Sequence, residues 1–302
     1  MRVFVTGATG FIGSAVVREL SDAGHEVVGL ARSGEAAAAV AAAGAEVRRG
    51  ALDDLDSLRS GAAAADGVIH TAYIHDFSRM ESAARTDLRA IETLGAALDG
   101  SGRPLVITTG TALVKPGQVA TEQDSSAPRA HPRLGAEQTA LALAARGVRT
   151  SIVRPGASVH GQGDHGFVPV LIDIARTKGV SAYIGDGSNR WPAVHRLDAA
   201  RLYRLALEKA PAGSVFHAVA DEGVPTRDIA EVIARHLNVP VVSIAPADAA
   251  EHFGWIGAFF AIDAPASSTL TQERLGWRPT HPTLIADLEA GHYFTQTQPA
   301  AA

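Results

Sequence analysis

A turn rich in glycine follows the first apolar run of the chain. Residues 2–5 (RVFV) are typical of a buried parallel strand, and the next segment, TGATGFIG, places three glycines just before a run with helical spacing. The first glycine permits a tight turn, the second lets the backbone approach a pyrophosphate, and the third lets the helix pack closely on the strand. Backbone N–H groups and the positive end of the helix dipole would then face the phosphates. The motif predicts a dinucleotide-binding turn, made of Gly7, Thr9, Gly10, Phe11, Ile12 and Gly13.

Strand-like and helix-like segments alternate over the first half of the chain. The strand-like runs lie at residues 2–5, 25–30, 45–49, 67–72, 104–109 and 149–154. Segments with helical spacing separate them, at residues 11–23, 35–43, 80–99 and 134–145. This alternation predicts an α/β fold with a Rossmann-type, doubly wound parallel sheet.

The composition changes after Pro155, where glycines, aromatic residues and histidines become denser. We expect a smaller, discontinuous substrate-binding domain that folds over the carboxyl edge of the sheet. The predicted dinucleotide-binding domain is 1–155 plus about 192–220, and the predicted substrate-binding domain is 156–191 and 221–302.

Several classes of protein are disfavoured by composition. No apolar stretch reaches the roughly 18 residues of a membrane span, and the first strand begins too early to leave room for a signal peptide. The chain has no cysteine, which excludes disulfides and thiolate chemistry and fits a cytoplasmic enzyme. A net charge of -5 without a basic stripe argues against nucleic acid as a partner. The 12 histidines are scattered without metal-ligand spacing, so no metal site is expected.

The end of the second strand-like run bears on the choice of coenzyme. Enzymes that use NAD usually carry Asp or Glu there, to accept hydrogen bonds from the ribose 2′-hydroxyl. The sequence VVGLARSGE has Arg32 and Ser33 instead. A guanidinium suits a 2′-phosphate, and such a charge-assisted contact contributes about 1.5–3 kcal/mol. We therefore expect NADP(H) rather than NAD(H), with a solvated surface arginine as the alternative interpretation.

An ordered set of motifs spans nearly the whole chain: TGATGFIG, DGVIHTA, PLVITTG, IVRPGASVHG and WPAVHRLDAAR. The set resembles the extended short-chain dehydrogenase/reductases, the family that includes NAD-dependent epimerases and dehydratases. The resemblance implies that Leu52 lies near the adenine, that Thr71 and Ala72 line the floor under the coenzyme, and that Pro155 passes the nicotinamide carboxamide. It also implies that Thr109 supplies the active-site hydroxyl, and that the protein forms a homodimer.

One part of the family pattern is missing. The family acid/base is a tyrosine with a lysine four residues later, and no tyrosine occurs between Tyr73 and Tyr183. Arg129 takes the tyrosine position and Arg133 the lysine position. Arg133 could still hydrogen-bond the ribose, whereas an arginine at the first position cannot exchange a proton near neutral pH. The chain is therefore an atypical member whose proton donor must come from elsewhere.

Candidate replacements follow the fourth strand-like run. Tyr73 could donate a proton through its phenol, and His75 could titrate near neutral pH beside Asp76. A loop that packs between the domains explains the same residues equally well. In the second half of the chain, His165 and Trp191 are candidates for contact with a small-molecule substrate.

The sequence thus predicts an NADP(H)-dependent oxidoreductase that acts by hydride transfer on a small carbonyl or alcohol. Two alternatives remain. One is a non-catalytic NADP(H)-binding protein that senses redox poise, favoured by the missing tyrosine. The other is a nucleotide-sugar epimerase or dehydratase.

Overall fold

Seven parallel strands form the central sheet, in the order β10-β6-β5-β4-β1-β2-β3. This computed structural model describes residues 1–76, 79–112, 114–125 and 135–295. The strands are β1 (Arg2–Thr6), β2 (Glu26–Ala31), β3 (Glu46–Arg49), β4 (Gly67–His70), β5 (Pro104–Thr108), β6 (Arg149–Pro155) and β10 (Ser214–Ala218). The order reverses at β1, which puts the carboxyl ends of β1 and β4 at the switch point where such sheets bind ligands.

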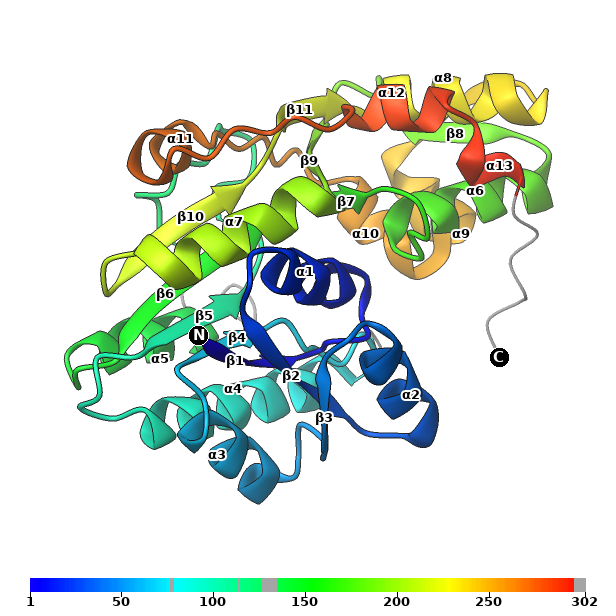
Figure 1. Ribbon diagram of the computed structural model, residues 1–302. Helices are drawn as coiled ribbons and strands as arrows, with labels where there is room; N and C mark the ends of the chain where they lie inside the picture. Colours follow the sequence, from blue (N-terminus) through cyan, green and yellow to red (C-terminus); the bar gives the residue numbers. More distant parts are fainter. Residues whose placement is uncertain (77–78, 113, 126–134, 296–302) are drawn as a thin grey trace.

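Helices cover both faces of this sheet (Figure 1). On one face lie α1 (Phe11–Asp22), α2 (Gly34–Ala42) and α7 (Arg196–Lys209), and on the other lie α3 (Leu55–Ala63), α4 (Met80–Ala97) and α5 (Gly135–Ala144). Side chains of β1 alternate between the two cores, with Val3 and Val5 in the first and Phe4 in the second. The predicted Rossmann-type, doubly wound α/β sheet is confirmed.

A second, smaller layer lies over the carboxyl edge (Figure 1). Its strands are β7 (Ser158–His160), β8 (Ser181–Ile184), β9 (Arg190–His195), β11 (Asp221–Pro225) and β12 (Val241–Ile244). Its helices are α6 (Phe167–Lys178), α8 (Thr226–Leu237), α9 (Ala249–Phe253), α10 (Gly257–Phe260), α12 (Leu284–Glu289) and α13 (His292–Thr295). Apart from β7, whose Val159 packs against the core of the sheet, these elements share their own hydrophobic core.

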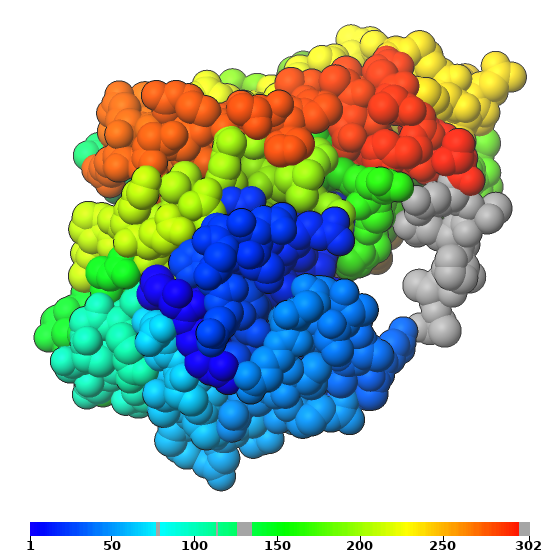
Figure 2. Space-filling view, in the orientation of Figure 1, coloured from blue at the N-terminus to red at the C-terminus, as the bar shows by residue number. Residues whose placement is uncertain are grey.

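The chain returns from this layer to the sheet through α7 and β10. Helix α7 packs against α1, and β10 pairs with β6 along its whole length. Strand β9 pairs instead with β7 and β11, so the boundary predicted at about 192 falls inside β9. Figure 2 shows α7 and β10 between the blue N-terminal part and the orange and red C-terminal part.

The C-terminal part is fastened to the start of α7. The indole Nε1 of Trp277 donates to the carbonyl oxygen of Asp198 at 2.9 Å, and the backbone amides of Thr280 and His281 donate to the Asp198 carboxylate. Both Trp277 and Asp198 are fully buried. Helix α11 (Thr269–Leu275) leads into this segment.

Several elements were not predicted from the sequence, among them α3 and α6. Helix α3 begins at the capping residue Asp54, whose side chain accepts from the amide of Ser57. Its apolar residues are few because only one narrow face is buried against Phe4 and its neighbours. Among the described helices, none has the length and apolar character needed to cross a membrane.

Candidate active site

The glycine-rich turn has the shape that its sequence predicts. Gly7 has φ +72°, and a Cβ built on it would lie 2.7 Å from the backbone nitrogen of Ala72. A Cβ on Gly13 would overlap the carbonyl oxygen of Gly7. Only glycine fits either position without moving backbone.

The first turn of α1 is open to a ligand. Gly10 is its N-cap residue and offers no side-chain cap, and the first turn contains no acidic residue. The leading amides of a helix need an outside acceptor, and the helix dipole favours a negative one. This cradle of backbone fits the pyrophosphate of a dinucleotide, with Phe11 and Ile12 at its edge.

The end of β4 forms the floor of the turn. The Thr71 hydroxyl donates to the carbonyl oxygen of Thr6 at 2.8 Å and lies directly beneath Gly7. Below it the buried ring of His70 hydrogen-bonds the Thr6 hydroxyl through Nδ1 at 2.7 Å and Asp87 through Nε2 at 3.0 Å. These buried contacts hold Thr71 and Ala72 in position relative to the glycine-rich turn.

The carboxyl ends of β2 and β3 carry two guanidinium groups. Arg32 is exposed immediately after β2, and Arg49 ends β3 and donates to the carbonyl oxygen of Ser33. The Ser33 hydroxyl caps α2 by accepting from the amide of Ala36 at 3.1 Å, which leaves its proton available to a phosphate oxygen. Leu52 is half-buried and packs against the core on the face of the sheet covered by α3, α4 and α5. The two residues directly after β2, where an acid usually holds the ribose 2′-hydroxyl, are thus Arg32 and Ser33, and the nearest carboxylate in sequence is Glu35 in the first turn of α2.

Thr109 follows β5 and is tied to a buried ion pair. Its hydroxyl donates to Glu137 Oε1 at 2.6 Å, and only 7% of Thr109 is exposed. The Glu137 carboxylate binds Arg154 through two hydrogen bonds, of 2.8 and 2.6 Å. Glu137 was not predicted as a site residue from the sequence, although one acid on α5 and one arginine on β6 were the signal for this contact. Pro155, the next residue, accepts from the amide of Thr111 at 3.0 Å.

Tyr73 and His75 lie side by side just after β4. Their ring centroids are 5.3 Å apart and the planes meet at 71°. Tyr73 is half-buried and His75 is exposed. The structure therefore brings these two predicted proton donors together at the carboxyl edge, close in sequence to the floor residues Thr71 and Ala72.

His165 lies against the coenzyme turn. Its ring meets the ring of Phe11 edge to face, with centroids 5.8 Å apart. The residue is exposed and comes just before α6. The structure thus joins His165, predicted for substrate contact, to a residue of the glycine-rich turn.

Trp191 belongs to an aromatic cluster of the second layer. It is only 1% exposed and packs against Phe260 and Phe167, with centroids 5.2 and 5.6 Å away. The ring of Phe167 also meets Trp255 at 6.0 Å and stacks on Phe259 at 5.8 Å. Trp191 is therefore the inner member, and the outer members are Phe167, Phe259 and Trp255, the last 46% exposed. Sequence reasoning missed Phe167 because it reads as one more apolar residue of a helix.

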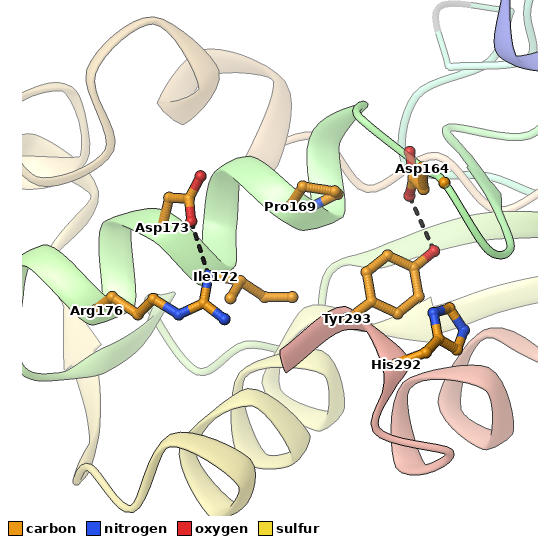
Figure 3. A pocket seen from close by; sticks show the side chains of 8 residues that line it. Asp164, Pro169, Ile172, Asp173, Arg176, His292 and Tyr293 are labelled. Atoms are coloured by element: carbon orange, nitrogen blue, oxygen red, sulfur yellow. Dashed lines mark hydrogen bonds and ion pairs between the residues drawn. The ribbon is translucent and has the colours of Figure 1, made fainter. Parts of the chain in front are cut away.

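A cavity beside α6 and α13 contains an unusual carboxyl group (Figure 3). Asp164 accepts from the Tyr293 hydroxyl at 3.0 Å and from the amide of Gly166 at 2.7 Å. Burial raises the pKa of Asp164 to about 6, against the opposing effect of these hydrogen bonds. None of the predicted coenzyme residues lines this cavity, whose other charged members, Asp173 and Arg176, form an ion pair.

The predicted residue Arg133, with Arg129, lies outside the described residues. Within the described ranges, no cluster of three His, Asp or Glu side chains could hold a metal ion.

Comparisons with known proteins agree with this geometry. The sequence model of the NAD dependent epimerase/dehydratase family matches residues 3–219. An uncharacterized protein of Schizosaccharomyces pombe is 54% identical over 97% of this chain and 100% of its own length. The 4-hydroxy-2-methyl-3-oxo-4-farnesyl-3,4-dihydroquinoline-1-oxide ketoreductase of Stigmatella aurantiaca is 31% identical over 72% of this chain and 67% of its own.

Among solved structures, the fold is similar to dTDP-glucose 4,6-dehydratase from Streptomyces venezuelae, in a double mutant with NAD bound. The TM-score is 0.79 at 21% identity, and the match covers 98% of each chain.

Proposed function

Since this chain belongs to the NAD dependent epimerase/dehydratase family and is an enzyme of the NAD(P)-dependent oxidoreductase type, we propose that it interconverts a ketone and an alcohol with NADP(H). The substrate ketone would carry an apolar group next to its carbonyl. Arg32 stands directly after β2, where an NAD enzyme usually carries a carboxylate, and this observation carries the choice of coenzyme.

Arg32 supports NADP(H) through its position and freedom. It follows β2 directly, is exposed, and makes no hydrogen bond or ion pair with any residue of the described ranges. The Ser33 hydroxyl and Arg49 stand beside it. Three donors at one edge match the acceptor oxygens of a 2′-phosphate.

The bound coenzyme would carry the hydride, and the chain would orient the substrate and supply the proton. Tyr73, with His75 against its ring, is the donor we propose for the reacting oxygen. Thr109 donates its hydroxyl proton to Glu137, so it can donate to a reacting carbonyl only by turning away from that carboxylate, while its oxygen can still accept from the hydroxyl of an alcohol. Tyr73 is therefore the better candidate for the proton and Thr109 for orientation.

The outer aromatic cluster, Phe167, Phe259 and Trp255, supports an apolar substrate. The segment at 253–262 (FGWIGAFFAI) contains no charged residue. The diphosphate of a nucleotide sugar would need cationic side chains, and segment 253–262 provides none. The Stigmatella relative is a ketoreductase whose named compound carries a farnesyl group. These observations favour an apolar ketone over the epimerase or dehydratase alternative.

A redox sensor remains the second candidate, since the chain has no tyrosine between Tyr73 and Tyr183. A sensor would bind the coenzyme without turnover.

We further propose that the protein forms a homodimer and is located in the cytoplasm.

The decisive measurement is NADPH oxidation by purified protein against apolar ketones, with UDP-glucose and dTDP-glucose as rival substrates. We expect turnover with an apolar ketone, roughly 10- to 100-fold loss of NADPH affinity in Arg32→Gln, and unchanged NADH affinity. NADPH binding without oxidation of any ketone would support the sensor. Conversion of a nucleotide sugar alone would replace the proposal.

A further inference from the structure

Arg196 stands where the two layers of the molecule meet. It is the first residue of α7 and comes directly after β9, the strand that leads back from the second layer. Its aliphatic stem passes Gly161, since a Cβ on that glycine would lie 3.3 Å from Arg196 Cγ. From there the side chain reaches the start of α1.

The guanidinium of Arg196 lies on the coenzyme turn. Its central carbon is 5.1 Å from the centroid of the Phe11 ring, the same ring that His165 meets from the second layer. Phe11 is the first residue of α1, directly after Gly10. Arg196 therefore lies against the side chain of the residue that begins α1, the helix whose leading amides would hold a pyrophosphate.

No carboxylate of the described residues forms an ion pair with Arg196. Apart from the Phe11 ring, it makes no hydrogen bond or ion pair with any of them. Neighbouring arginines differ: Arg190 pairs with Asp263, Arg201 with Asp198, and Arg204 with Glu19 and Glu208. Arg196 is the exception along this stretch of chain.

The surroundings make that exception costly. Arg196 is half-buried, and burial, with Arg18 next, lowers its pKa. Asp164 is a nearby acid that favours the charged form of Arg196, but its carboxylate accepts from the Tyr293 hydroxyl and the Gly166 amide and not from Arg196. A partly buried cation beside another cation is unfavourable unless an anion joins them.

We propose that Arg196 is a second cationic ligand of the coenzyme pyrophosphate, presented from the junction with the substrate-binding layer. The inference rests on the proposed coenzyme use and adds a residue outside the glycine-rich motif. Bound coenzyme would thereby touch both layers, through the amides of α1 and through Arg196. A contact made only to the Phe11 ring is the rival explanation.

Two variants separate a phosphate ligand from a packing residue. Arg196→Gln removes the charge, and Arg32→Gln is the matched control at the far end of the coenzyme. Dissociation constants would be measured by calorimetry for NADPH, NADH and adenosine 2′-monophosphate, which has no pyrophosphate. Melting of the free protein would report any structural role.

We expect Arg196→Gln to weaken NADPH and NADH alike, by about 10- to 100-fold, because both carry the pyrophosphate. Adenosine 2′-monophosphate should bind as to the unaltered protein, and the melting temperature should not change. Arg196→Lys should recover part of the affinity for both coenzymes, and added salt should weaken the binding of NADPH to this variant.

Three results would overturn the proposal. The first is that Arg196→Gln binds NADPH and NADH with dissociation constants within twofold of those of the unaltered protein. The second is a loss of affinity for NADPH alone. The third is a lower melting temperature of Arg196→Gln, with its weaker binding restored under stabilising conditions. If the unaltered protein itself binds neither coenzyme, the proposed function fails first, and this inference fails with it.

Discussion

The candidate sites in the two layers of this protein are built by different means. In the sheet layer the candidate site is made of backbone, because Gly7 and Gly13 bring main-chain atoms where any side chain would collide, and Gly10 offers no side-chain cap at the start of α1. In the second layer it is made of side chains, because Phe167 packs against three rings from two other segments of the chain, one on β9 and two within 253–262. Backbone recognition tolerates no variation and suits a coenzyme that never changes. Side-chain recognition can vary and suits a substrate that differs between relatives.

The largest effect should come from placing a methyl group in the backbone site. Gly13→Ala would drive its Cβ into the carbonyl oxygen of Gly7, so the turn must shift away from its pyrophosphate-binding shape. We expect coenzyme affinity to fall by at least about 100-fold, measured by calorimetry. Gly24→Ala is the control, since its φ is +82° but nothing lies within 4 Å of the added Cβ. Coenzyme binding by Gly13→Ala equal to that of the control would contradict the backbone account.

The next effect tests the ion pair beneath the site. Glu137→Gln leaves the buried Arg154 guanidinium without its carboxylate, and breaking such a pair from one side costs about 3–5 kcal/mol. Urea unfolding of the coenzyme-free protein would measure it. Replacing both residues, as Glu137→Gln with Arg154→Met, should recover part of the loss. A single variant as stable as the parent protein would show that the pair does not support the site.

A smaller effect concerns the pH dependence of the second layer. The pKa of Asp164 is about 6 in the folded protein, raised by burial, against 3.8 as its ordinary value. The folded state therefore holds this proton more tightly, and the resulting stability is complete below about pH 4 and lost as the pH rises through 6. Asp164→Asn removes the charge, so we expect it to be more stable than the parent at pH 7.5 by about 2–3 kcal/mol and similar to it at pH 4.

The groups facing Asp164 decide whether this difference is observed. Tyr293 donates to it, Gly166 donates through its amide, and His160 and His165 favour its charged form. In Asp164→Asn the Tyr293 hydroxyl can turn to the carbonyl oxygen of Gly161, 3.4 Å away, so packing is retained. Urea titrations of both proteins across this pH range provide the measurement. A constant difference between them at every pH would exclude the raised pKa as its cause.

The smallest effect should appear at the rim of the aromatic cluster. Trp255 is 46% exposed, so Trp255→Ala should barely change stability. If the ring contacts substrate, KM for an apolar ketone should rise about 5- to 10-fold, near 1 kcal/mol of lost apolar contact, while kcat stays close to that of the parent. Leu141→Ala, an exposed apolar change on α5, is the control. An equal KM in both variants would remove Trp255 from the substrate site.

The sequence predicted the sheet layer better than the second layer, for a physical reason. A glycine that is required by a close backbone contact can be recognised at a single position of the sequence. The elements around it, β1, α1 and β2, also follow one another directly in the chain. The contacts of Phe167, Arg196 and Glu137 join residues far apart in the chain, and no spacing rule places them together. Trp191 illustrates the limit: the sequence indicated its neighbourhood, but only the structure shows that Phe167 stands in front of it.

The clamp of Trp277, Thr280 and His281 on Asp198 has a consequence for how the chain is completed on the ribosome. Most of α7 packs on α1 and the sheet core, but its first turn is completed by residues about 80 positions further along the chain. A nascent chain that stops short of Trp277 would lack these partners of Asp198. The last contacts of α7 therefore form only after the C-terminal segment has been translated.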